Sequence, residues 1–201
     1  MKRLLFALCS IALAAQAQQG STADTGSTAK TGDAAKAGGP GGMPRPDPAL
    51  TKAFGNSVGT WRCNGKMMLP KEMGGREVNS RSSMTIRKEL GGFAYTGDWK
   101  SEKNEAFPGM QGKMTWTYDA GSKKLIEFSV DSMGDVMRGE ADASEDGKMV
   151  WNEEGTMMGK TSKTRTTVSM KGKNQLDLAF DVQGDGGWAP MGKESCTKGG
   201  G

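Results

Sequence analysis

Apolar and polar residues alternate with a period of two along most of the chain beyond residue 53. The apolar positions of successive segments are Trp61, Cys63 and Met67; Met84 and Ile86; Phe93, Tyr95 and Trp99; Met114, Trp116 and Tyr118; Ile126, Phe128 and Val130; Met149 and Trp151; Val168 and Met170; and Leu176, Leu178, Phe180 and Val182. Successive side chains of a strand point to opposite faces of a sheet, so each segment predicts an antiparallel strand with one buried face.

Turn-forming residues separate these segments. They include Asp119-Ala120-Gly121, Met133-Gly134-Asp135, Asp146-Gly147 and Lys171-Gly172-Lys173. Glycine after Asp supplies the positive φ that a tight hairpin needs. The pattern predicts an all-β fold with about ten strands and no helical stretch. An antiparallel up-and-down barrel of about 8–10 strands is favoured over a sandwich, because closure removes exposed edges.

The N-terminus has the three parts of a secretory signal peptide. Lys2 and Arg3 precede the apolar run 4–15, and Ala15-Gln16-Ala17 forms a cleavage site. We expect cleavage after Ala17 and a periplasmic or secreted mature protein. The alternative is a lipoprotein signal acylated at Cys9, but Cys9 lies in the middle of the apolar run.

Residues 18–52 are rich in Gly, Ala, Ser, Thr and Pro and contain no aromatic residue. Such a segment cannot bury enough apolar area to offset its ordering, so it predicts a disordered linker before a domain at residues 53–198. A spacer is favoured over a proline-rich recognition motif at residues 44–48.

Charge and composition argue against several classes of partner and of catalytic chemistry. The 201 residues include 27 Lys and Arg, 23 Asp and Glu, and no histidine. Without Lys2 and Arg3 the net charge is only +2, so nucleic-acid binding is not indicated. The apolar run 4–15 is also too short to predict a membrane span. We expect the protein to be a monomer. Without histidine, Ser-His-Asp catalysis and His-ligated metals are excluded.

Two cysteines remain once Cys9 leaves with the signal peptide. Cys63 lies in the first predicted strand and Cys196 in the last. In an exported protein an even pair predicts a disulfide, and a closed barrel places the first strand beside the last. We therefore predict a Cys63–Cys196 bond at the barrel seam, the alternative being two free thiols.

Several motifs resemble a family of bacterial exported proteins classed as a domain of unknown function. They are Gly59-Thr60-Trp61-Arg62-Cys63, Leu90-Gly91-Gly92-Phe93, Trp116-Thr117-Tyr118-Asp119 with Lys123-Lys124, and Asp146-Gly147-Lys148. The resemblance covers roughly residues 54–197 and implies a lipocalin-like barrel. It makes Trp61 the match to the lipocalin tryptophan that plugs one barrel end. Related haem-binding barrels use a histidine, so haem is not indicated, and no cofactor is expected.

Aromatic and methionine side chains of inward parity are the candidate ligand-binding residues. They are Trp99, Trp116, Trp151, Met84, Met114 and Phe128. Methionine lines adaptable apolar pockets and also suits Cu(I), but no compact methionine cluster indicates a metal site. The leading hypothesis is non-catalytic binding of a small apolar or amphipathic molecule. The alternative is an envelope structural or interaction module whose barrel is filled by these side chains.

Three charged residues share parity with inward positions. Lys88, Arg138 and Glu153 would then be paired or would orient a ligand. A carboxylate-based enzyme is a weaker alternative, since no spacing singles out a pair of acids and no catalytic residue is assigned.

Overall fold

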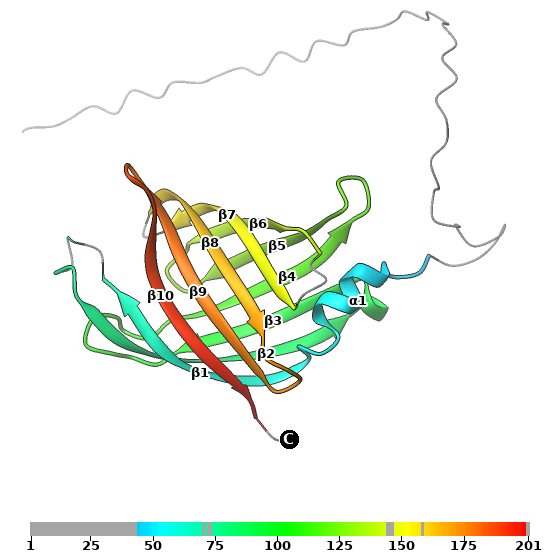
Figure 1. Ribbon diagram of the computed structural model, residues 1–201, viewed down its shortest axis with the longest axis horizontal. Helices are drawn as coiled ribbons and strands as arrows, with labels where there is room; N and C mark the ends of the chain where they lie inside the picture. Colours follow the sequence, from blue (N-terminus) through cyan, green and yellow to red (C-terminus); the bar gives the residue numbers. More distant parts are fainter. Residues whose placement is uncertain (1–43, 70, 72–73, 144–146, 158, 200–201) are drawn as a thin grey trace, which may run out of the picture. The chain divides into compact units, whose positions relative to one another are not determined.

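The computed structural model describes residues 44–69, 71, 74–143, 147–157 and 159–199, and the predicted signal peptide and most of the predicted linker lie outside them. Ten antiparallel strands form a closed barrel in which sequential strands pair (Figure 1). The strands are β1 (Gly59–Met68), β2 (Glu77–Glu89), β3 (Ala94–Ser101), β4 (Gln111–Asp119), β5 (Lys124–Asp131), β6 (Val136–Ala141), β7 (Lys148–Met157), β8 (Lys160–Met170), β9 (Gln175–Gly184) and β10 (Gly187–Lys198). The all-β up-and-down barrel predicted from the alternation is confirmed.

The barrel closes where β1 pairs with β10, red in Figure 1. Cys63 and Cys196 lie directly opposite one another in this register, and the predicted disulfide joins them. Both cysteines are buried. The bond therefore fastens the first strand to the last across the interior face of the seam.

A short helix, α1 (Pro48–Phe54), precedes β1. The side chain of Asp47 accepts a hydrogen bond from the Ala49 backbone N–H, and Pro48 occupies the first turn, where its missing N–H costs little. Leu50 and Phe54 lie on one face of the helix and are buried. The expectation that the chain contains no helix was therefore wrong, and most of α1 precedes residue 53, the predicted start of the domain.

The α1 end of the barrel contains the main apolar core. Phe54 contacts the rings of Tyr95, Trp116 and Trp151, with centroid separations of 5.4, 5.1 and 6.3 Å. Trp61 is also buried there, and its Nε1–H donates to the Ser57 carbonyl at 2.7 Å. We call Phe54, Tyr95, Trp116 and Trp151 the aromatic floor.

The opposite end of the barrel is packed less completely. Inward positions near the far ends of the strands are mostly half-buried, and they carry Met, Phe, Val, Ser and Gly. They include Met67, Trp99, Ser129, Met137, Ser162, Phe180 and Val182. The two ends therefore differ: one is closed by the aromatic floor, and the other keeps its inward side chains partly accessible.

Candidate ligand site in the barrel interior

Three glutamates point into the barrel beyond the aromatic floor. Glu127 on β5 lies opposite Trp116 and Gly139 in the sheet register, and it is only 2% exposed. Glu153 on β7 lies opposite Gly139 from the other side. Glu194 on β10 is also buried. Three acids thus occupy an interior whose walls are otherwise mainly apolar.

Glu194 is held entirely by its neighbours. One carboxylate oxygen accepts from the Ser80 hydroxyl at 2.5 Å and the other from the Ser82 hydroxyl at 2.9 Å. Both oxygens therefore have partners, as a buried carboxylate requires. Glu194 serves as an anchor between β10 and β2.

Glu127 and Glu153, here called the acid pair, face each other across β6. A Cβ atom at Gly139 would lie 3.0 Å from Glu153 Cγ and 3.5 Å from both Glu127 Cβ and Trp151 Cε3. A side chain at this position would crowd Glu153, and glycine leaves the space free. The missing side chain thus allows acids from β5 and β7 to approach across the intervening strand.

Each acid of the pair is hydrogen-bonded through one of its oxygens. Trp116 Nε1–H donates to Glu127 Oε2 at 2.6 Å. The hydroxyls of Thr164 and Thr166 donate to Glu153 Oε2 at 2.5 and 3.2 Å. These bonds orient both carboxyl groups from the neighbouring strands.

The pKa of Glu127 is raised from 4.5 to about 8, mainly by burial and also by the nearby charge of Glu153, while the Trp116 hydrogen bond lowers it. The pKa of Glu153 is raised by burial and held down by the Thr164 and Thr166 hydroxyls. At neutral pH the neutral form of Glu127 is therefore favoured.

The second oxygen of Glu127, Oε1, has no hydrogen-bond partner among the described residues. Every fully enclosed side-chain nitrogen or oxygen in the described part of the chain does have a partner. Oε1 therefore keeps a small accessible area, although Glu127 as a whole is almost wholly buried. This oxygen can donate its proton to an acceptor when Glu127 is neutral, and it can accept from a further donor when Glu127 is ionised.

The predicted aromatic residues divide between the two parts of the interior. Trp116 and Trp151 belong to the aromatic floor and are buried, so they form the core and present only part of their surface to the acid pair. Trp99 is half-buried and lies nearer the opposite end, with its indole over Gly112 of β4. A Cβ at Gly112 would lie 2.5 Å from Trp99 Nε1, so the glycine lets this ring lie against the wall.

Met84 and Met114 also face inward. Met84 lies opposite Trp61 and Trp99, and Met114 lies opposite Gly97, between β3 and β5. Both are partly buried and pack against the core. They therefore line the region between the aromatic floor and the opposite end, where a flexible thioether adapts to varied shapes.

Three sequence-based assignments of orientation require correction. Phe128 faces outward and is 51% exposed, because Glu127, and not Phe128, has inward parity on β5. Arg138 lies opposite Phe128 on the outer face and pairs with Glu140 at 2.7 Å. Lys88 has inward parity but is exposed at the end of β2. Glu153 alone of the three charges points into the interior.

Sequence reasoning missed Glu127 and Glu194. In β5 the residues Ile126, Phe128 and Val130 made the even positions look like the buried face. The one sequence feature that pointed to Glu127 was Leu125, which is fully buried and shares its parity. Glu194 could have been inferred from its parity with Cys196, two residues further along β10.

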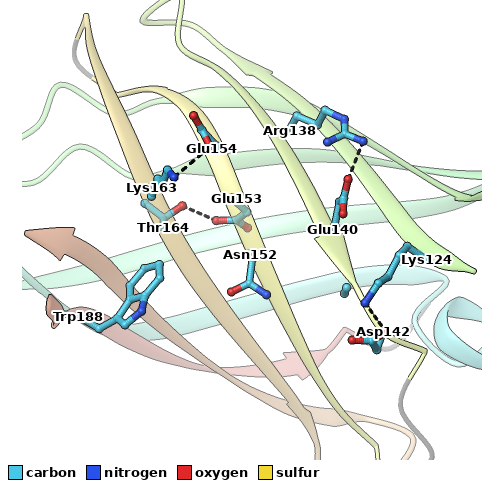
Figure 2. A pocket seen from close by; sticks show the side chains of 11 residues that line it. Lys124, Arg138, Glu140, Asp142, Asn152, Glu153, Glu154, Lys163, Thr164 and Trp188 are labelled. Carbon is cyan, nitrogen blue, oxygen red and sulfur yellow. Dashed lines mark hydrogen bonds and ion pairs between the residues drawn. The ribbon is translucent and has the colours of Figure 1, made fainter. Parts of the chain in front are cut away.

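The outer wall carries two hollows. One, of about 400 Å³, lies over β6, β7 and β8 (Figure 2). Its ion pairs Lys124–Asp142, Arg138–Glu140 and Lys163–Glu154 largely neutralise one another. The other, of about 630 Å³, lies over β2 to β5, where Arg87 and Lys113 both pair with Asp98. These ion pairs account for most of the charge in both hollows.

Metal binding has one geometric candidate within the described residues. The Sγ atoms of Cys63 and Cys196 and a carboxylate oxygen of Glu194 lie within 4.8 Å of one another. The two sulfur atoms form the disulfide and offer no thiolate, while the oxygens of Glu194 accept from serines. These residues do not fit a metal site.

No helix in the described part of the chain has both the length and the apolar character needed to cross a membrane.

Comparisons with known proteins concern the barrel. Residues 50–197 match the family described as "Protein of unknown function (DUF1579)". Among curated proteins none matches the chain. Among solved structures, the S-type phycobiliprotein lyase CPES from Guillardia theta is similar, with a TM-score of 0.47 and 10% sequence identity over 78% of this chain and 99% of that one.

Proposed function

Because the chain belongs to the DUF1579 family, whose function is unknown, its role has to be inferred from the barrel, and we propose that it binds a small amphipathic molecule inside. Binding is non-catalytic in this proposal. The ligand enters at the end opposite α1 and lies on the aromatic floor. The closed up-and-down barrel and the family predicted from the sequence motifs are both confirmed.

The observation that carries the proposal is the difference between the two barrel ends. The aromatic floor is buried, whereas Met84, Met114 and Trp99 beyond it are only partly buried. Small barrels whose interior is not filled by side chains hold one small ligand. The mixture of apolar wall and buried carboxyl groups favours a ligand with one apolar part and one polar group.

The alternative is a solidly packed barrel that acts as a structural or interaction module in the cell envelope. The two functions differ in whether a small molecule enters the interior. A variant that fills the interior separates them, provided that a matched variant adds the same side chain outside.

Ser129 and Thr115 supply this pair of positions. Ser129 faces inward between Met114 and Met137, and Thr115 is exposed on the outer face of β4. We expect the uncharged fluorescent probe N-phenyl-1-naphthylamine to bind the wild-type protein saturably. S129F should weaken this binding about tenfold or more, and T115F should leave it within about twofold.

Circular dichroism and thermal unfolding of each variant verify that the barrel is intact. Absence of saturable probe binding to the wild-type protein would favour the packed module. Equal loss in S129F and T115F would place the probe outside the barrel. Native mass spectrometry of protein purified from its source then searches for a molecule that co-purifies.

We also propose that the protein works outside the cytoplasm. A buried disulfide is typical of proteins that fold in oxidising compartments. N-terminal sequencing of the mature protein tests the accompanying prediction of cleavage after Ala17, and an N-terminus that retains residues 1–17 would contradict it.

A further inference from the structure

We infer that the ligand carries a basic nitrogen, and that its protonated amine is held by the acid pair, Glu127 and Glu153. This inference rests on the proposed function, because it names the chemical class of the molecule that the barrel interior takes. Three features of the described residues support it: the charges that face the pair, the unpartnered oxygen, and the neighbouring indole rings.

No described residue that faces the acid pair from a packed strand carries a positive charge. The titratable inward residues on these strands are Tyr118 on β4, Asp131 on β5 and Glu153 on β7, while β6 contributes Met137, Gly139 and Ala141. On β8 the inward neighbours are the hydroxyls of Thr164 and Thr166. The acids thus have no cationic partner on these strands.

The nearest lysines of inward parity lie at strand ends. Lys88 and Lys160 are exposed at the ends of β2 and β8. Lys198 donates to the Asn56 carbonyl at 3.0 Å and lies over the Trp61 ring. Buried acids are normally paired with a cation. An interior that contains acids and no facing cation therefore has the polarity expected for the binding of a positively charged ligand.

The unpartnered oxygen, Glu127 Oε1, gives a cationic ligand a place to bind. Glu127 is more than nine-tenths buried, yet its Oε1 keeps a small accessible area and has no hydrogen-bond partner among the described residues. An ammonium group brings several N–H donors and can bond both Glu127 Oε1 and the second oxygen of Glu153. A carboxylate-bearing ligand would instead meet acids of its own charge.

The indole rings complete the site for a cation. Trp116 is hydrogen-bonded to Glu127, and the Cε3 atom of Trp151 lies beside the space that a side chain at Gly139 would fill. Aromatic faces attract ammonium groups, most strongly when the groups are desolvated. The apolar part of the ligand then extends past Met84 and Met114 toward the open end.

A metal ion fits the acid pair less well than an amine. Within the described residues, the group of three metal-ligating side chains lies at the disulfide and not at Glu127 and Glu153. Hard divalent cations need six or more oxygen ligands in most protein sites. Two carboxyl groups flanked by indoles match an ammonium group better.

Three ligands of equal chain length test the inference: octylamine, 1-octanol and octanoate, each displacing N-phenyl-1-naphthylamine from the wild-type protein at pH 8. We expect octylamine to bind about tenfold or more tightly than 1-octanol, and octanoate to bind most weakly. Octylamine affinity should also rise with pH between about 6 and 8, where Glu127 loses its proton, since alkylamines stay protonated up to about pH 9.

The double variant E127Q/E153Q keeps the shape of the acid pair and removes its charge. It should lose the preference for octylamine and the pH dependence while it still binds the uncharged probe and 1-octanol. The matched control is E154Q, which removes an exposed acid on the outer face of the same strand. E154Q should behave as the wild-type protein does.

Two failures are distinguishable. If the wild-type protein binds the probe and 1-octanol but shows no preference for octylamine, or if E127Q/E153Q keeps that preference, the inference is overturned and the proposed function stands. If the wild-type protein binds neither the probe nor any of the three ligands, the proposed function itself is overturned.

Discussion

At the scale of single residues, the protein tolerates a carboxyl group in its interior by keeping it protonated. Glu127 is almost wholly buried, beside Trp116 and close to a second acid. An ionised group there would lose its hydration without gaining a cationic partner, so the neutral form is favoured. The position thus carries a cost that grows as the pH rises.

This cost predicts a pH-dependent stability. Because the folded-state pKa of Glu127 is raised from 4.5 to about 8, the folded protein binds more protons than the unfolded chain between these values. The free energy of unfolding of the wild-type protein should therefore be highest below about pH 5, fall toward pH 8 by a few kcal/mol, and then level off.

E127Q removes the titrating group while its amide oxygen can still accept from Trp116. We expect this variant to lose most of the pH slope and to be more stable than the wild-type protein at pH 8, with Glu153 supplying the remaining slope. Urea unfolding from pH 5 to 8 measures the difference, with E154Q as the control. A slope in E127Q as steep as that of the wild-type protein would contradict the protonated state of Glu127.

Residue orientation was predictable where one parity of a strand is clearly more apolar. Trp61, Trp116 and Trp151 all point inward, as their alternation with polar neighbours indicates. On β5 the rule fails because Phe128 and Val130 are exposed, apolar and of outward parity. The alternation therefore placed Glu127 on the wrong face of β5. An alternation pattern reports only the hydrophobicity of a strand's own residues, whereas the inward face is decided by contacts with the neighbouring strands.

At the scale of elements, α1 closes the interior that the strands enclose. The helix has only seven residues, too few for a stable isolated helix, so its stability comes from the packing of Leu50 and Phe54. Its sequence, between prolines and a glycine, lacks the repeated apolar spacing that predicts longer helices. The strands were predictable from local alternation, whereas this helix depends on contacts that the barrel provides.

F54A tests the role of α1 in the floor. Phe54 contacts three aromatic rings, so truncation leaves a cavity against Tyr95, Trp116 and Trp151. We expect a loss of about 3–5 kcal/mol in the free energy of unfolding and a red shift of the tryptophan fluorescence. Thr51 is exposed on the same helix, so T51A should change the stability by less than about 0.5 kcal/mol. Equal effects of the two substitutions would show that the helix does not seal the barrel.

At the scale of the whole molecule, closure depends on the pairing of β1 with β10. These strands are the first and last of the barrel, so their contact is the most distant in sequence and the most costly in chain entropy. The disulfide between Cys63 and Cys196, separated by 133 residues, keeps this contact in the unfolded chain as well as in the folded barrel. The cysteine positions predicted it from the sequence because closure of an up-and-down barrel leaves few other neighbours for the first strand.

The double variant C63A/C196A measures how much the disulfide adds to the stability that the backbone hydrogen bonds between β1 and β10 provide. By the chain-entropy model, a closed loop of this length contributes up to about 5 kcal/mol, and residual structure in the unfolded chain reduces this contribution. We expect the variant to keep its β circular dichroism spectrum and to unfold with a free energy about 3–5 kcal/mol lower than that of the oxidised protein. Reduction of the wild-type protein during unfolding should give a comparable loss without altering the interior. If both treatments cost less than about 1 kcal/mol, the unfolded chain already holds β1 near β10, and the disulfide then matters for resistance to opening and not for the equilibrium stability of the barrel.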